Sequence, residues 1–300
     1  MMPPTSPTAS TITPPLLDLG HLAGSILLFG GPYSNLQATL ALREQAEHLA
    51  IPSDRVICTG DVVAYCAEPA ETINAIRDWG CHVVMGNCEE ALAEGGDDCR
   101  CGFEKGSECD LLAVKWFAHA SSQISVDQRT WMANLPHPVT FQAAERRFAV
   151  VHGHARDLSE WVFASTPKAE KQAALEALGV DAIIAGHSGL PFTQELASGR
   201  VWHNPGVIGV PANDGTPRVW YSLIIPTADG IVFEHRALDY DHKTAADRMI
   251  DTGLPDAYAR SLSTGLWPNL DVLPTDEAAA TGKPLDPGHL TWNWPRRRVA

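Results

Sequence analysis

The chain has 300 residues, a hydrophobic fraction of 45% and a formal net charge of −14, values typical of a globular protein that buries a sizeable core. The acidic balance argues against non-specific binding to nucleic acid or to an anionic membrane, because attraction to phosphates needs Lys and Arg. The sequence has no run of about 18 apolar residues and no signal-peptide pattern at its start. We therefore expect a cytoplasmic protein without a membrane span, whose cysteines are mostly reduced.

The first part of the chain alternates between apolar runs and helical patterns. Residues 1–20 are rich in Pro, Thr and Ser, and we expect a disordered leader there. The patterns that follow predict strand, helix, strand, helix and strand, at residues 26–29, 36–49, 56–59, 71–79 and 81–85. Such an alternation predicts right-handed crossovers and a largely parallel sheet.

The second part of the chain changes from alternating to consecutive strands. Residues 88–110 read as an irregular insertion rich in Cys, Gly and acidic residues. Helices are then expected at 111–119, 127–135, 168–178, 244–252 and 256–262, and strands at 138–142, 147–151, 182–185, 200–203, 218–225 and 231–238. The late run of strands predicts a second sheet packed on the first. We expect one domain over residues 21–264 and an extended tail over residues 265–300.

Four of the predicted strands end in the same way, with a glycine beside a polar side chain that can bind a metal. These side chains are Asp61, Asn87, His152 and His187. Ligands bind at the carboxyl ends of strands in α/β proteins, and glycine lets the backbone approach a ligand closely. A mixed set of oxygen and nitrogen donors suits Mn, Fe, Zn or Co. One such side chain alone is more often an ordinary core or loop residue, but the fourfold recurrence predicts a metal site.

The order and spacing of five motifs resemble the calcineurin-like metallophosphoesterases, in particular their small bacterial phosphodiesterases. The motifs are Gly60-Asp61, Gly86-Asn87-Cys88-Glu89, Val151-His152-Gly153, Gly186-His187 and Asn204-Pro205-Gly206. The resemblance runs from about residue 25 to residue 262. It implies an α/β fold, a four-layer α/β/β/α sandwich of two mixed sheets flanked by helices. It also implies that Asp61, Asn87, His152 and His187 bind one metal, with the aspartate bridging to a second.

The departures from the family pattern concern the second metal. Gly31 and Tyr33 stand where the family has Asp-x-His, and Gly189 stands where it has the second histidine of Gly-His-x-His. We therefore expect one divalent ion per chain and a remodelled second site. Tyr33, His154 and His203 are candidate substitutes there. The alternatives are a Tyr33 ring that fills the vacated space and two ordinary loop histidines.

The remaining candidate residues concern catalysis and redox chemistry. Cys88 stands where many relatives have a histidine that protonates the leaving group, and Asn35, at a helix start, is a candidate phosphate-binding residue. Cys99, Cys101 and Cys109 are candidates for a second metal or a redox site. They are alternatively surface thiols or one disulfide.

These patterns favour a metal-dependent phosphoesterase or phosphodiesterase acting on a small molecule that contains phosphate. Its candidate catalytic residues are Asp61, Asn87, Cys88 and His152. One alternative is a catalytically degenerate member of the family that acts as a binding or scaffold protein. Another is an altered activity that depends on metal and cysteine. The sequence leaves the oligomeric state open, and a homo-oligomer is one outcome.

Overall fold

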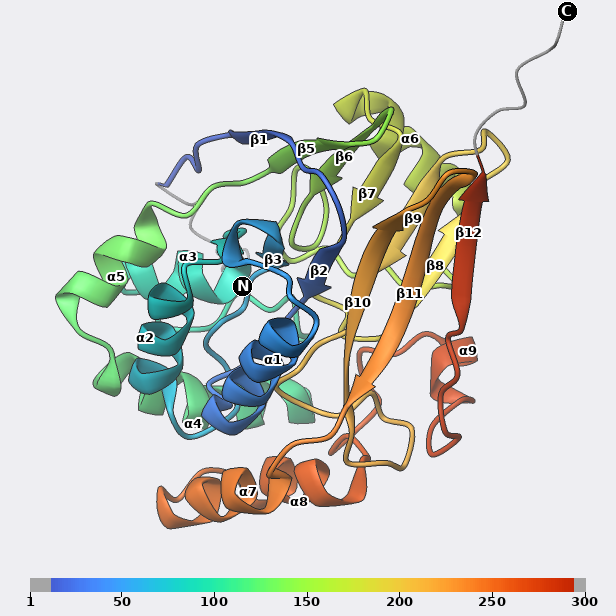
Figure 1. The fold of residues 1–300 in the computed structure, drawn as a ribbon. Coiled ribbons are helices and arrows are strands. Elements are labelled where there is room, and N and C mark those ends of the chain that lie inside the picture. Colours follow the sequence, from blue (N-terminus) through green and yellow to red (C-terminus); the bar gives the residue numbers. More distant parts are fainter. Residues whose placement is uncertain (1–11, 294–300) are drawn as a thin grey trace, which may run out of the picture.

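The computed structural model of the chain describes residues 12–293 and contains two mixed six-stranded sheets over that range (Figure 1). One sheet has the strand order β1-β5-β6-β7-β9-β8 and the other β12-β11-β10-β2-β3-β4. The strands are β1 (Leu17–His21), β2 (Ile26–Phe29), β3 (Val56–Cys58), β4 (His82–Val83), β5 (Val139–Ala143), β6 (Arg146–Val150), β7 (Ala182–Ile184), β8 (Phe192–Glu195), β9 (Val201–Asn204), β10 (Val219–Pro226), β11 (Gly230–Leu238) and β12 (His289–Asn293). The helices are α1 (Leu36–His48), α2 (Pro69–Trp79), α3 (Asn87–Glu94), α4 (Glu108–Gln123), α5 (Val126–Ala133), α6 (Lys168–Leu178), α7 (His242–Asp251), α8 (Asp256–Thr264) and α9 (Thr275–Ala278), with a 3-10 turn at Ser53–Arg55.

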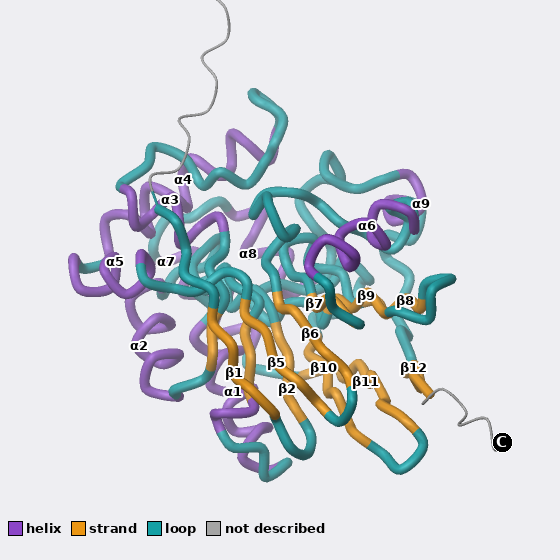
Figure 2. The backbone as a smooth tube through the Cα atoms, turned by 90° about the horizontal axis from the view of Figure 1, so that it is seen from above, coloured by secondary structure: helices purple, strands orange, loops and turns teal. Residues whose placement is uncertain are grey.

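The strand β2 shows how the layers are held together. All four of its residues are buried, so successive side chains meet apolar partners on opposite faces of the sheet. Leu27 and Phe29 pack under the helices that cover one face, and Ile26 and Leu28 pack against the other sheet. Helix α6 covers the outer face of that second sheet. The result is the expected four-layer α/β/β/α sandwich, with strands in two layers between helices (Figure 2).

The predicted alternation of strands and helices in the first part of the chain is confirmed. Strands β2, β3 and β4 are neighbours and run parallel, joined by α1 and α2. Pro69 occupies the first turn of α2 and Gly80 ends the helix in the left-handed conformation, as expected for these residue types. Within residues 12–293, no helix is both long and apolar enough to span a membrane.

The expected leader and tail both contribute strands, so the predicted boundaries need correction. Strand β1 lies in the expected leader and pairs parallel with β5. In the expected tail, β12 pairs antiparallel with β11, and Trp292 is buried against Phe148 and Phe233. Trp292 is the one buried side chain of β12. A strand with one buried residue shows no alternation of apolar and polar residues, so the sequence pattern did not predict it. The outermost parts of both segments lie outside the described residues.

Further elements differ from expectation, among them α9, a short helix in the expected extended tail. The insertion at residues 88–110 is not irregular at its start, because α3 occupies Asn87–Glu94. Strand β8 was not expected and pairs antiparallel with β9 at the edge of its sheet. The side chains of β8 are only half buried, so they lack the apolar run that marks a central strand.

Candidate metal centre

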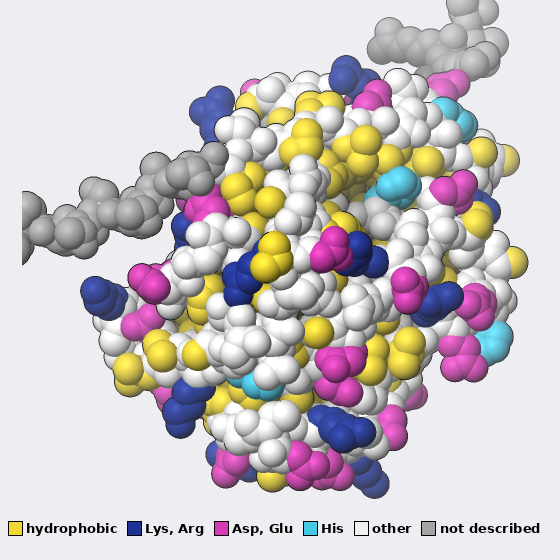
Figure 3. All heavy atoms as spheres, turned by 90° about the vertical axis from the view of Figure 1, so that its left-hand side faces the viewer, with side chains coloured by type: hydrophobic (Ala, Val, Ile, Leu, Met, Phe, Trp, Pro, Cys, Tyr) yellow, Lys and Arg dark blue, Asp and Glu magenta, His cyan; other side chains and the backbone are white. Residues whose placement is uncertain are grey.

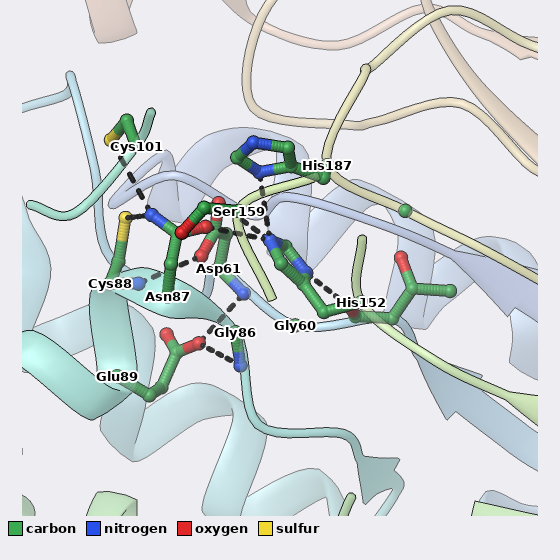
Figure 4. Close-up of polar contacts among 12 residues, drawn as sticks. Gly60, Asp61, Gly86, Asn87, Cys88, Glu89, Cys101, His152, Ser159 and His187 are labelled. Carbon is green, nitrogen blue, oxygen red and sulfur yellow. Dashed lines mark hydrogen bonds and ion pairs between the residues drawn. The ribbon is translucent and has the colours of Figure 1, made fainter. Parts of the chain in front are cut away.

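Four polar side chains from both sheets converge at one end of the sandwich (Figure 4). Asp61 follows β3 and Asn87 follows β4 in one sheet, whereas His152 follows β6 and His187 follows β7 in the other. The two histidine loops are tied together by a hydrogen bond from the Gly186 N–H to the His152 carbonyl oxygen. The carboxyl ends of parallel strands in both sheets therefore build one site.

The donor atoms of this cluster are spaced as the ligands of one metal ion would be. His152 Nε2 lies 3.0 Å from Asn87 Oδ1, 3.2 Å from His187 Nδ1 and 3.2 Å from Asp61 Oδ2. Bonds of about 2.0–2.2 Å to a divalent ion place neighbouring ligand atoms roughly 3 Å apart. All four side chains are buried. The spacing and the burial both suit a bound cation.

Hydrogen bonds outside the cluster fix which atoms point inward. His152 Nδ1 donates to the Thr59 carbonyl oxygen at 2.7 Å, which leaves Nε2 to face the other donors. Asn87 Nδ2 donates to the Cys99 carbonyl oxygen at 2.8 Å, which turns Oδ1 inward. Lone pairs that converge in this way repel one another unless a cation or a proton lies between them. The residues present therefore fit a divalent ion.

The residues beside two of the ligands have to be glycines, because any side chain there would collide with the atoms of the centre. A Cβ atom on Gly60 would lie 2.8 Å from His152 Nδ1, and one on Gly86 would lie 2.4 Å from Asp61 Oδ1. Asp61 and His187 both have a φ of 56°, a left-handed conformation that few residues other than glycine adopt. Such a conformation is typical of a functional site. The recurring glycine in the sequence thus reflects the geometry of the centre.

Glu89 supports the centre without belonging to it, and sequence analysis did not assign it a role. Its buried carboxylate accepts hydrogen bonds from the N–H groups of Asp61 (2.8 Å), Val62 (2.7 Å) and Gly86 (3.0 Å). Burial and the Asp61 charge raise the pKa of Glu89 to about 7, although two of these N–H groups oppose the shift. The local signal was its place three residues after the N-cap of α3, the position of a capping-box glutamate.

The charges of the cluster depend on one another. Burial works to raise the pKa of Asp61, but His152 and the Cys88 N–H hold it below its ordinary value. Burial works to lower the pKa of His152, but Asp61 outweighs it and the pKa is raised. The pKa of His187 falls to about 3 because the ring is buried beside His152. His187 is therefore neutral at physiological pH, as a metal ligand must be.

Aromatic rings lie beside the two glycines at which the chain departs from the family pattern. A Cβ atom on Gly31 would lie 2.4 Å from Cζ of Tyr33, and one on Gly189 would lie 3.7 Å from the Trp267 ring. Tyr33 is 4% exposed and packs edge-on against Tyr65. Burial, followed by the Asp61 charge, raises the pKa of Tyr33 well above its ordinary value, so its hydroxyl stays neutral. The ring of Tyr33 thus lies beside Gly31 with its hydroxyl neutral, and it lines the same pocket as His187.

Two of the candidate histidines are not brought to the centre. His154 pairs with Glu160, with Nδ1 3.6 Å from a carboxylate oxygen. His203 lies in the interior, bonded to the hydroxyls of Thr193 (2.8 Å) and Ser222 (2.6 Å). These contacts contradict the expectation that either histidine completes a second metal site.

Asn35 caps a helix, so the expectation that it binds phosphate is not supported. Its Oδ1 accepts from the Ala38 N–H of α1 at 3.1 Å. Its Nδ2 donates to the Gly209 carbonyl oxygen at 2.9 Å and to the Tyr240 hydroxyl at 3.2 Å. The side chain is buried and both ends of its amide are used. A helix N-cap and a phosphate ligand have the same sequence signature, and only the surroundings separate them.

The cysteines take different positions from those of a thiolate metal site. Cys99 and Cys101 form a disulfide beside Asn87, with Cys101 Sγ 3.5 Å from Asn87 Nδ2. Cys109 lies apart from them and donates to Asn269 Oδ1 at 2.9 Å. The Cys88 N–H donates to Asp61 Oδ1 at 3.2 Å, and burial raises the pKa of its thiol. Of the expected alternatives, one disulfide is the arrangement found.

Comparisons with known proteins give a family and a fold. A model of the calcineurin-like phosphoesterase superfamily domain matches residues 34–225. An uncharacterized protein of Methanocaldococcus jannaschii is 24% identical over 247 residues, which cover 78% of this chain and 95% of that protein. The structure of a hypothetical protein of Pyrococcus horikoshii OT3 is similar with a TM-score of 0.69 at 16% identity, covering 82% of this chain and 100% of that one. A metallophosphoesterase from Sphaerobacter thermophilus gives a TM-score of 0.62 at 22% identity, with the same two coverages of 82% and 100%.

Proposed function

Because the chain belongs to the calcineurin-like phosphoesterase superfamily, we propose that it is a metal-dependent phosphoesterase that works with one divalent ion. The observation that carries the proposal is the convergence of Asp61, Asn87 and His187 on His152 Nε2 at 3.0–3.2 Å. These four residues would hold the ion, for which Mn, Fe, Zn and Co are the candidates. The substrate would be a small molecule that contains phosphate.

The charge of the donor set suits a phosphate ester. Asp61 is the one ligand among the four that carries a negative charge, since Asn87 and the two histidines cannot be anionic. A divalent ion with one carboxylate keeps a net positive charge, which attracts an anionic phosphate into the buried centre. When bound, the ion supplies polarisation of a phosphoryl oxygen and a lower pKa for water. Asp61, Asn87 and the two histidines orient it.

The surroundings of the ligands support a single ion. Gly31 and Gly189 offer no donor atoms, and the rings of Tyr33 and Trp267 lie next to them. The Cys88 thiol, with its raised pKa, holds its proton tightly and is a poor general acid. We therefore propose slower hydrolysis than with two ions, and a preference for leaving groups that need no protonation.

The distribution of surface charge supports a small substrate over a polymer. On the face shown in Figure 3, acidic and basic side chains are interspersed with each other, and the chain carries a net charge of −14. A nucleic-acid backbone needs a continuous basic surface.

Metal content and hydrolysis test the proposal together. We expect about one ion per chain in purified protein, and turnover of p-nitrophenyl phosphate or bis-p-nitrophenyl phosphate with added Mn²⁺. Asp61→Asn should lose at least about 99% of the turnover, because the centre loses its anionic ligand. The matched control is His154→Gln, a histidine next in sequence to the centre but paired with Glu160, and it should keep wild-type activity.

Two results would count against the proposal. Two ions per chain would refute the single-ion centre. Bound metal with no turnover of either ester, unchanged by Asp61→Asn, would favour the alternative of a binding or scaffold protein.

A further inference from the structure

We propose that an aromatic pocket beside the metal centre binds a planar ring of the substrate, so that the preferred substrates are phosphate esters of aromatic alcohols. The proposal rests on the function proposed above and adds the class of the leaving group. The pocket and the centre share His187. A ring bound in the pocket would therefore lie next to a phosphate bound at the centre.

Rings from distant parts of the chain form the walls of this pocket. They come from Tyr33, Tyr65, Trp161, Tyr258 and Trp267. The cavity volume is about 60 Å³, room for several water molecules. Aromatic walls favour a flat occupant, since rings gain from edge and stacked contacts beyond the burial of area.

The walls are held in place before any ligand binds. The centroid of the Tyr65 ring lies 4.8 Å from that of Tyr33 and 4.9 Å from that of Tyr258. Trp161 packs against His187, with centroids 4.1 Å apart. Trp267 Nε1 donates to the Pro211 carbonyl oxygen at 2.7 Å, which fixes the plane of its ring. A pocket that needs no rearrangement loses little conformational entropy on binding.

One buried polar atom at the pocket points to a ligand that accepts hydrogen bonds. Among the pocket residues that the structure describes, Asn269 Nδ2 has no hydrogen-bond partner. Asn269 Oδ1 accepts from the Cys109 thiol, so Nδ2 is a donor. The ring of His187 is not a second such group, because the backbone carbonyl oxygens of Cys101 and Ser159 are its partners. A buried donor without a partner is costly, and an aromatic ligand that carries an acceptor atom would satisfy it.

The pocket exists because of the residues that depart from the family pattern. Gly189 presents no side chain toward Trp267, and Gly31 leaves room for the ring of Tyr33. Trp267 and Asn269 come from the segment after α8, which folds back to line the pocket. The same substitutions that remove candidate metal ligands thus create an apolar wall on that side.

Binding of two inert phosphonates tests the pocket without any need for turnover. Phenylphosphonate and methylphosphonate share the group that would bind the metal and differ in the ring. On Mn²⁺-loaded protein, calorimetry should give a Kd for phenylphosphonate at least about tenfold lower than for methylphosphonate, because a buried ring adds apolar contact. Trp267→Leu should remove this preference, and so should Val272→Trp, which fills the pocket from its rim. Both variants should keep the metal content and the Kd for methylphosphonate.

The matched control is Trp131→Leu, a tryptophan on α5 that does not line the pocket, and it should keep the preference. Equal affinity for the two phosphonates in the wild-type protein would overturn the proposal, and so would a preference that survives both pocket variants. A ring preference that Trp267→Leu and Val272→Trp abolish would support it even if no ester is hydrolysed. In that case only the hydrolytic function proposed above would fail.

Discussion

Replacement of Glu89 tests the hydrogen bonds that support the metal centre, without changing any of its candidate ligands. The carboxylate accepts from four backbone N–H groups, those of Asp61, Val62, Val63 and Gly86, and all four are buried. In Glu89→Gln one of the two acceptor oxygens becomes an amide donor, so at least one of these N–H groups loses its partner. A buried donor without a partner costs about 1–3 kcal/mol. We expect the free energy of unfolding to fall by that amount, measured by urea denaturation.

The same variant should weaken metal binding although Glu89 touches no metal. Its bonds hold the backbone of Asp61 in the left-handed conformation that aims the carboxylate at His152. Loss of such outer support typically lowers metal affinity about 10–100-fold. Titration of metal-free protein with Mn²⁺ measures the effect. Glu44→Ala, at an exposed position on α1, is the control and should change stability by no more than about 0.5 kcal/mol. Wild-type stability together with wild-type Mn²⁺ affinity in Glu89→Gln would refute the reasoning.

Three further predictions concern other residues. Asn35→Ala should lower the free energy of unfolding by about 2 kcal/mol, while the KM for p-nitrophenyl phosphate stays unchanged; a raised KM would restore Asn35 as a phosphate ligand. The double variant Cys99→Ser/Cys101→Ser should keep its metal content by mass spectrometry, because the four ligands lie elsewhere, and a loss of metal would show that the cysteines contribute. Burial lowers the pKa of His235 from 6.5 to about 4, so between these pH values the unfolded chain binds a proton that the folded chain does not. The free energy of unfolding should therefore fall as the pH is lowered through this window, by up to about 3 kcal/mol from this residue. In His235→Asn it should fall less steeply with pH, and equal slopes in the two proteins would contradict the assignment.

The four candidate ligands could be found from sequence because their geometry is local. Each follows a short apolar strand. The glycine beside it is needed at Gly60 and Gly86, because a Cβ atom there would lie less than 3 Å from the neighbouring atoms. A strand, a glycine and a polar residue stand next to one another in the chain, so the pattern survives as a motif. Parallel strands β3 and β4, and β6 and β7, then bring the motifs together at strand ends.

The features that sequence missed all depend on contacts between distant segments. Glu89 binds the N–H of Asp61 from 28 residues away, and nothing in its local pattern names that partner. Trp267 reaches the pocket beside Gly189 only because the chain folds back after α8, and the sequence predicted no such return of the tail. Asn35 had the right local signature but the wrong surroundings, since Gly209 and Tyr240 use its amide. Propensity and spacing carry no information on such pairings.

His187 joins the metal centre to the aromatic pocket, because one ring belongs to both. Nδ1 lies 3.2 Å from His152 Nε2 in the centre, and the ring lines the pocket beside Trp161, with centroids 4.1 Å apart. A cation bound at Nδ1 would hold this ring in place as a wall of the pocket. A ligand ring that packs against it in turn favours the state with the cation bound. Because such coupling is reciprocal, the ion and the aromatic ester would each raise the affinity of the other by the same factor. The proposed single ion and the proposed ring are thus two parts of one binding site, and Gly31 and Gly189 mark the place where a ring takes up the space of a second ion.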